Sequence, residues 1–332
     1  MAIPRQRGFY LTARRLRVSL LIAALLVWPV PAAAQNNANA VDINSLAADA
    51  FPQMTLFFEA FNDQGQFLSG LTKSQVSILE NETALPLDEL QLMEPGVQII
   101  LAYNLNPTFA NRTAGVSRFD AFQTVLLDWI SANPPILNDD LSLASNTGLQ
   151  TIRMRGSENW LQAVQTFQPD LARQQSSLLS LSEALDLATD PNPSTLMKRF
   201  ILYITPLPQA GSLDALKNLS ARASQLGVRV GVWLLAPANA PERSAELVTP
   251  LQTLAEQNGG QLFIFSGSES LPDLEQTVAP LRHVYQAQWT SKIAQSGSQD
   301  IRLQVEQGSQ KLLSVPRSLT LEVQPPNPIF LA

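Results

Sequence analysis

Few residue types in this chain are able to carry catalytic chemistry. Its 332 residues include one histidine, His283, and no cysteine. A thiolate nucleophile, a disulfide framework, an iron–sulfur cluster and a cysteine-based zinc site are therefore excluded, and only one imidazole is available as a general base. That base would need a positioned nucleophile, but the chain has no G-x-S-x-G, S-x-x-K or H-E-x-x-H motif. We therefore expect His283 to be structural and the protein not to be an enzyme.

Acidic pairs are the remaining candidates for catalysis. The pairs of nearby acids that we consider are Asp139 with Asp140, Glu80 with Glu82, and Asp273 with Glu275. Glycoside hydrolysis needs two carboxyl groups that face each other across a sugar, and near neighbours on a turn or a first helical turn do not supply that geometry. The alternative function is a hydrolase, or an enzyme-associated subunit, that acts through acids at the carboxyl edge of a sheet.

The N-terminus has the pattern of a secretory leader. Residues 1–17 carry five arginines and no acid, an apolar run follows at Val18–Trp28, and Ala32–Ala34 are small. This order is typical of a signal peptide over residues 1–34, and the apolar run is shorter than the roughly 20 residues that span a bilayer. We predict a secreted or bacterial envelope protein that keeps no stable membrane span after cleavage.

The charge balance narrows the class of partner. The whole chain carries 22 Lys and Arg against 28 Asp and Glu, a formal net charge of −6. Removing the leader takes away five arginines, so the mature chain is more acidic still. Such a chain repels nucleic acid, which we therefore exclude as a partner.

The hydrophobic pattern changes twice along the mature chain. Residues 35–50 are rich in Asn and Ala and predict a flexible lead-in, and residues 51–96 alternate short strands with turns. From residue 97 to 282, apolar strands such as 97–103 alternate with helical patterns, which indicates an α/β fold with a doubly wound, mostly parallel sheet. Residues 283–332 return to short strands. That the two β segments pair with each other into one small module is a hypothesis.

This order of elements resembles a von Willebrand factor type A (VWA) domain of a bacterial exported protein. The segment before the first central strand contains Asn62–Gly65, Gly70–Thr72 and Val76–Glu80, which are similar to pieces that precede the domain in such proteins. The diagnostic feature of the family is the metal-ion-dependent adhesion site, with D-x-S-x-S after the first central strand, a later Thr, and an Asp after a further strand. Mg²⁺ prefers oxygen ligands and usually one or two carboxylates.

The resemblance places this site on neutral residues. The first motif falls on Asn104, Asn106 and Thr108, the Thr position falls at Ser176 or Ser177, and the late Asp is replaced by Pro206. Both carboxylates are missing, so we predict a degenerate site without metal or cofactor. The resemblance implies a protein-binding, adhesion or scaffold role, with Asn104, Asn106, Thr108, Ser177 and Pro206 lining the contact surface.

Overall fold

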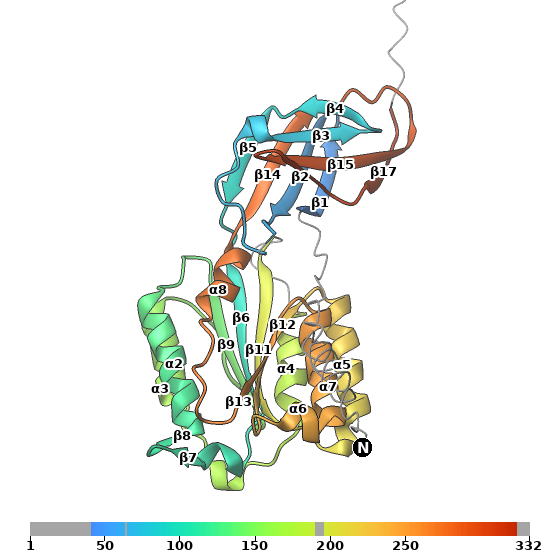
Figure 1. Cartoon of the computed structure of the whole chain (residues 1–332). Coiled ribbons are helices and arrows are strands. Elements are labelled where there is room, and N and C mark those ends of the chain that lie inside the picture. Colours follow the sequence, from blue (N-terminus) through green and yellow to red (C-terminus); the bar gives the residue numbers. More distant parts are fainter. Residues whose placement is uncertain (1–40, 64, 190–195, 324–332) are drawn as a thin grey trace, which may run out of the picture. The chain divides into compact units, whose positions relative to one another are not determined.

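A six-stranded, mostly parallel sheet forms the centre of the α/β segment (Figure 1). The computed structural model describes residues 41–63, 65–189 and 196–323. Neighbouring strands of the sheet pair in parallel except for β10, which pairs antiparallel with β9. In spatial order the strands are β10 (Gly148–Met154), β9 (Asp140–Ser145), β6 (Val97–Tyr103), β11 (Lys198–Pro206), β12 (Arg229–Leu235) and β13 (Leu262–Phe265).

The central strands are apolar because both of their faces are covered. Every residue of β6 is buried, as are the last seven residues of β11. Along β6, alternate side chains belong to two separate core clusters: Ile99 and Leu101 contribute to one, Ile100 and Ala102 to the other. A continuous apolar run is the expected sequence of such a strand.

Helices pack on both faces of this sheet, α2 and α3 on one and α4, α5 and α7 on the other (Figure 1). Ser117 begins the first of them by accepting a hydrogen bond from the amide of Asp120 at 3.0 Å, a standard N-cap. The helices are α2 (Arg118–Ala132), α3 (Ser157–Thr166), α4 (Leu179–Leu187), α5 (Leu213–Gln225), α6 (Ala240–Arg243), α7 (Ala245–Gln257) and α8 (Glu275–Val278).

Strands from before and after the α/β segment pair in two antiparallel sheets. The first has the order β1-β2-β14-β5 and the second the order β16-β15-β3-β4, with β17 also paired to β15. A small hairpin of β7 (Arg112–Thr113) and β8 (Val116–Ser117) is separate from both. The strands of the two sheets are β1 (Val41–Ala50), β2 (Gln53–Ala60), β3 (Val76–Glu80), β4 (Thr83–Pro86), β5 (Glu89–Met93), β14 (Val284–Thr290), β15 (Gly297–Gln307), β16 (Gln310–Leu313) and β17 (Arg317–Leu321).

Strand β1 corrects the expectation of a flexible lead-in over residues 35–50. Residues 41–50 pair antiparallel with β2, and Val41 and Ile43 are buried in a core cluster that also contains Ile301 from β15. The composition of this segment is that of a linker, but two buried residues and a paired backbone outweigh it. Residues 35–40 and the leader expected over residues 1–34 lie outside the described residues. Within the described part of the chain, no helix has the length and apolar character needed to cross a membrane.

Candidate functional site

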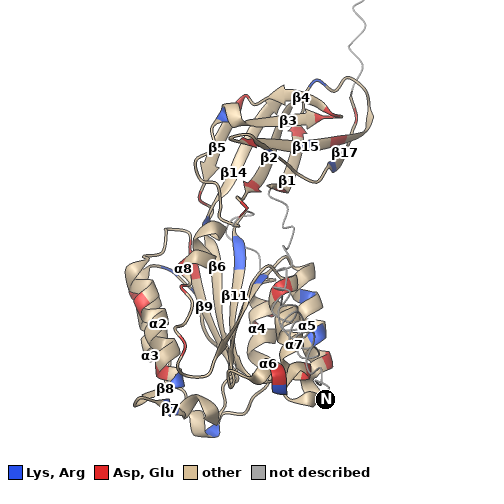
Figure 2. Cartoon of the chain, in the orientation of Figure 1, with Lys and Arg blue, Asp and Glu red and all other residues tan. Residues whose placement is uncertain are grey.

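Four loop segments at or beside the carboxyl ends of β6, β9 and β11 form a surface without charged side chains. We call residues 104–110, 146–147, 174–178 and 206–209 the carboxyl-edge surface. These segments contain no Asp, Glu, Lys or Arg. In Figure 2, strands β6 and β9, whose carboxyl ends lead into this surface, are almost entirely without charged residues; the one acid, Asp140, is the first residue of β9. Open α/β sheets bind ligands at this edge, so it is the candidate site.

Asn104 is the centre of this surface and is itself buried, with 2% of its area exposed. Its backbone amide donates to the carbonyl of Ile204 at 2.8 Å, which places it beside the end of β11. Its side-chain Nδ2 donates to Thr205 Oγ1 at 2.9 Å and to the Tyr203 hydroxyl at 3.3 Å, and its Oδ1 accepts from the amide of Ser177 at 2.8 Å. One amide group therefore joins three segments of the chain.

The hydroxyl groups beneath Asn104 are neutral. Burial raises the pKa of Tyr203 to about 12, so its hydroxyl stays protonated at physiological pH. Thr205 Oγ1 donates to the carbonyl of Pro206 at 2.9 Å and is thereby oriented to accept from Asn104. These residues form a network of hydrogen bonds between uncharged groups.

Asn146 fixes the neighbouring loops in the same way. It directly follows β9, and its Oδ1 accepts from the amide of Leu105 at 2.9 Å. Its Nδ2 donates to the carbonyls of Leu105 and Gln175, each at 2.6 Å. Two asparagine side chains, at 104 and 146, thus tie the loop after β6 to the segment 174–178 that precedes α4.

The loop after β6 ends in a short 3-10 turn, Pro107–Ala110. Asn106 caps this turn by accepting from the backbone amide of Thr108 at 3.0 Å and from the Thr108 hydroxyl. Phe109 anchors the turn because its ring is fully buried and lies 5.9 Å from that of Phe122. Thr108 is left exposed at the surface.

Of the five predicted contact residues, two are buried in the structure and three are accessible. Asn104, Ser177 and Pro206 are brought together at adjoining strand and loop ends, and Asn106 bonds to Thr108 next to them. The expectation that all five line the surface is wrong for Asn104 and Pro206, which are buried. Asn104 points inward because its amide finds partners there on two other segments. Asn106, Thr108 and Ser177 remain accessible.

Sequence reasoning missed Asn146, Thr205 and Tyr203. Tyr203 and Thr205 lie near the carboxyl end of β11 and Asn146 directly follows β9, so their positions alone could have marked them as candidates. Their role depends on the direction in which each side chain points, which the spacing of the motif does not encode.

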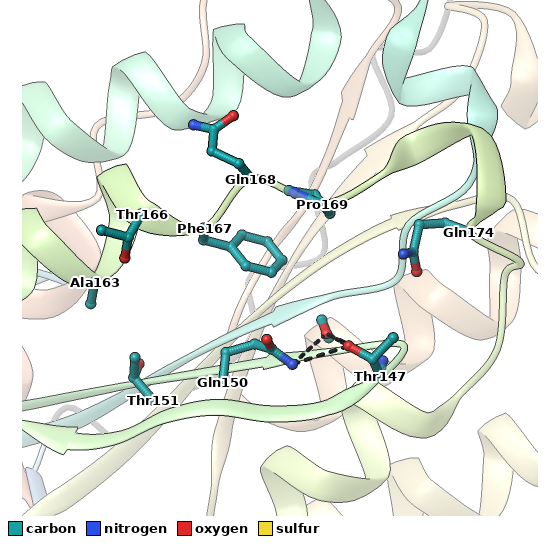
Figure 3. A pocket seen from close by; sticks show the side chains of 10 residues that line it. Thr147, Gln150, Thr151, Ala163, Thr166, Phe167, Gln168, Pro169 and Gln174 are labelled. Atoms are coloured by element: carbon teal, nitrogen blue, oxygen red, sulfur yellow. Dashed lines mark hydrogen bonds between the residues drawn. The ribbon is translucent and has the colours of Figure 1, made fainter.

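A shallow pocket of about 300 Å³ adjoins the carboxyl-edge surface (Figure 3). All of its lining residues are uncharged, and most carry hydroxyl or amide groups. Gln150 donates to Ser145 Oγ and Thr147 Oγ1, each at 3.1 Å, and the Phe167 ring lies between this group and Gln168. The pocket continues the neutral, hydrogen-bonding character of the surface.

A divalent metal does not fit the residues at the degenerate adhesion-site positions. Both polar atoms of the Asn104 side chain are committed to partners within the protein, and Asn106 Oδ1 accepts two hydrogen bonds. No carboxylate stands among them to offset the dehydration of Mg²⁺. Across the described ranges, no group of three or more His, Asp and Glu residues is placed to hold a metal ion.

The acidic pair Asp139 and Asp140 lies at the opposite, amino end of the sheet. Asp140 is the first residue of β9 and is paired in register with Gln98 near the start of β6. Asp139 forms a buried ion pair with Arg282, Oδ2 to Nε at 2.7 Å, and accepts from the amide of Val97 at 2.9 Å. Neither acid can therefore complete a metal site at Asn104.

Asp140 is a buried acid without a hydrogen-bond partner among the described residues. Burial raises its pKa to about 6, and the like charge of Asp139 acts in the same direction, while Arg153 and Arg155 oppose the shift. The Gln98 amide beside it also has no partner in the described part of the chain.

His283 occupies a structural position. Its ring lies 5.7 Å from the ring of Phe67, and Nδ1 is 3.1 Å from the carbonyl of Ala279. Its Nε2 is 3.4 Å from Glu94 Oε1. Among the described residues, no serine or threonine hydroxyl is hydrogen-bonded to this ring.

Comparison with known proteins gives similarities of structure alone. No protein-family profile and no curated protein matches the sequence. An aerotolerance-related membrane protein from Bacteroides fragilis is 16% identical over 56% of this chain and 98% of its own, with a TM-score of 0.40. The VWA domain of SpRpn10 is 13% identical over 55% of this chain and 93% of its own, with a TM-score of 0.41.

A third similar structure carries an occupied metal site. Proximal thread matrix protein 1 from the mussel byssus, solved with zinc in its MIDAS motif, is 10% identical over 60% of this chain, with a TM-score of 0.43. The match covers 49% of that protein, so this chain spans about half of its length. Each of the three is a similarity of fold over part of this chain.

Proposed function

We propose that this chain is an exported, non-catalytic protein-binding or scaffold module built on a VWA-like domain, with a contact surface that works without metal. The order of the sheet and the helices on both of its faces support a doubly wound domain over residues 97–282. The pairing of β14 with β2 and β5 supports a small β module made from the two flanking segments, residues 51–96 and 283–332.

One observation carries this proposal: at the position where the resembling family has a metal-ligating Asp, the Asn104 side chain itself bonds to the neighbouring strand and loop. In the resembling family, a metal would hold together the strand ends and loops at this edge. Here the Asn104 amide connects Ser177, Thr205 and Tyr203 by hydrogen bonds. The edge is therefore ordered without an ion, and a partner need not supply a carboxylate to complete a coordination shell.

The exposed part of the carboxyl-edge surface determines the chemistry of the partner. Asn106, Thr108 and Ser177 are accessible, and the adjoining pocket is lined by uncharged residues. We expect a partner that presents neutral hydrogen-bonding groups. Binding of this kind is less sensitive to ionic strength than binding through salt bridges.

Capture of partners from an envelope extract tests the contact surface. We expect Thr108→Arg to reduce recovery of the wild-type partner by about tenfold, because a long charged side chain at an exposed position blocks a neutral interface. The matched control is Thr124→Arg, an exposed threonine of α2 outside the surface, which should recover the partner as the wild type does.

The captured partner is then purified and its affinity for the wild type and the two variants is measured by calorimetry at low and high salt. Equal affinity of the wild type and Thr108→Arg would remove the carboxyl-edge surface as the contact. A partner whose affinity collapses in high salt would contradict the neutral interface.

A further inference from the structure

Two side chains, one on β1 and one on β11, contact the same carboxylate oxygen of a third side chain on β2. Glu59 Oε1, on β2, lies 2.5 Å from Lys198 Nζ, on β11. The same oxygen accepts a hydrogen bond from Asn44 Nδ2, on β1, at 2.7 Å. Lys198 Nζ and Asn44 Nδ2 are therefore separated by no more than the sum of these two distances. An amine, a carboxamide and a carboxylate are the groups needed to exchange one amide for another.

A β-bulge brings Asn44 to this oxygen. In the pairing of β1 with β2, Ile43 lies opposite Phe58 and Ser45 opposite Phe57, so Asn44 is the extra residue between them. A bulge turns the side chain of its extra residue away from the regular alternation of the strand. In β1 this leaves the Asn44 amide directed at Glu59, and Asn44 itself on the exposed side of the strand.

The lysine is held in a largely dry position. The side chain of Lys198 is 17% exposed and that of Glu59 is 10% exposed. Burial lowers the pKa of Lys198, and the positive charge of Arg229 acts in the same direction, while Glu59 and Asp42 oppose the shift. A lower pKa increases the share of neutral amine, which is the nucleophilic form of lysine. Lys198 Nζ also donates to the carbonyl of His283 at 3.2 Å, which restricts its position.

We propose that Lys198 and Asn44 form an intramolecular isopeptide bond, with Glu59 as the group that moves the protons. Glu59 takes one proton from the Lys198 ammonium, and the neutral Nζ attacks Cγ of Asn44. The Nζ–Cγ bond forms and the Cγ–Nδ2 bond breaks. A second proton passes from Nζ to Nδ2, which leaves as ammonia toward solvent, and Glu59 returns its proton to water or to the ammonia. No oxidant, metal or co-substrate is required.

The product would tie β1 to β11 by a covalent bond between residues far apart in sequence. The inference does not rest on the proposed function, because none of its three residues belongs to the carboxyl-edge surface. It uses general acid–base chemistry at distances within the range over which such proton transfers occur.

Mass spectrometry of the full purified chain tests the bond. We expect the mass of the wild type to be about 17 Da, one ammonia, below the mass of the unmodified chain. The unmodified mass is calculated from the sequence between the termini determined for the sample. Digestion should give one branched peptide that contains both Asn44 and Lys198. Separate, unmodified peptides for the two residues would overturn the proposal.

Two variants and one control assign the reaction. Asn44→Ala leaves the pair of Glu59 and Lys198 in place and should restore the calculated mass, and Glu59→Gln should do the same by removing the proton carrier. The control Asn111→Ala, at an exposed asparagine, should keep the loss of ammonia. A loss of ammonia that persists in folded Asn44→Ala would place the modification elsewhere and contradict the assignment.

Discussion

Replacing Arg282 with methionine is expected to lower the free energy of unfolding by about 3–5 kcal/mol at pH 8. The Arg282 side chain is 6% exposed and its partner Asp139 is fully buried, with Nε and Oδ2 2.7 Å apart. Arg282 Nη1 also pairs with Glu275, which accepts a hydrogen bond from Trp129 Nε1 at 2.9 Å. Methionine retains much of the volume but leaves a buried carboxylate without its counter-charge. Urea unfolding of the wild type and the variant measures the difference.

The pH dependence identifies the cause of that loss. Burial raises the pKa of Asp139 even beside Arg282, and without the guanidinium it rises further. A folded-state pKa above the unfolded value means that the folded variant takes up a proton as pH falls, so its stability recovers toward acid pH. The deficit should therefore be smaller at pH 5 than at pH 8. A deficit that is equal at both pH values would mean that lost packing, and not the unpaired Asp139, is responsible.

A matched substitution separates burial from charge. Arg222 Nη2 lies 2.6 Å from Asp186 Oδ1, but these side chains are 35% and 58% exposed. Exposed ion pairs contribute at most about 1 kcal/mol, so Arg222→Met should change the free energy of unfolding far less than Arg282→Met.

The second large effect is expected at Asn104. Asn104→Ala removes hydrogen bonds to Thr205 and Tyr203 and leaves the amide of Ser177 without its acceptor. The loss of these buried hydrogen bonds should lower the free energy of unfolding by about 2–4 kcal/mol. The variant should also exchange the backbone amide hydrogen of Ser177 faster, because that bond protects it in the wild type.

The control for this substitution is Asn159→Ala. Asn159 is exposed on α3 and donates to the carbonyl of Arg155, just before the helix, at 2.7 Å. Its replacement should change the free energy of unfolding by no more than about 0.5 kcal/mol. Equal costs at positions 104 and 159 would show that Asn104 does not hold the carboxyl edge together.

The central strands could be predicted because a strand that is buried on both faces consists of consecutive apolar residues. The apolar run at 97–103, predicted as a strand, forms β6 with the same bounds. The prediction of a flexible lead-in over residues 35–50 was wrong at β1. Only Val41 and Ile43 of that strand are buried and apolar, and its pairing with β2 depends on tertiary structure. Helix α8 begins at Glu275, whose backbone amide donates to Asp273 Oδ1 at 3.0 Å, a contact that no apolar pattern marks.

The position of the candidate site followed from topology, but its bonding did not. Residues after parallel strands meet at one edge, so Asn104 and Pro206 could be placed together from spacing. That Asn104 turns inward to Thr205, and that Asn146 supports it, depends on side-chain directions. The pair of Asp139 and Arg282 joins residues 143 positions apart, and no local pattern marks such a partner.

Thermal unfolding of the purified chain with Mg²⁺, with Mn²⁺ and with EDTA tests whether the carboxyl-edge surface is ordered without a metal ion. A ligand that binds only the folded state raises the midpoint in proportion to its affinity and concentration. Because Asn104 already satisfies the strand and loop ends with uncharged hydrogen bonds, we expect the same midpoint in all three conditions. A midpoint several degrees higher with either ion than with EDTA, lost in Asn104→Ala, would contradict it.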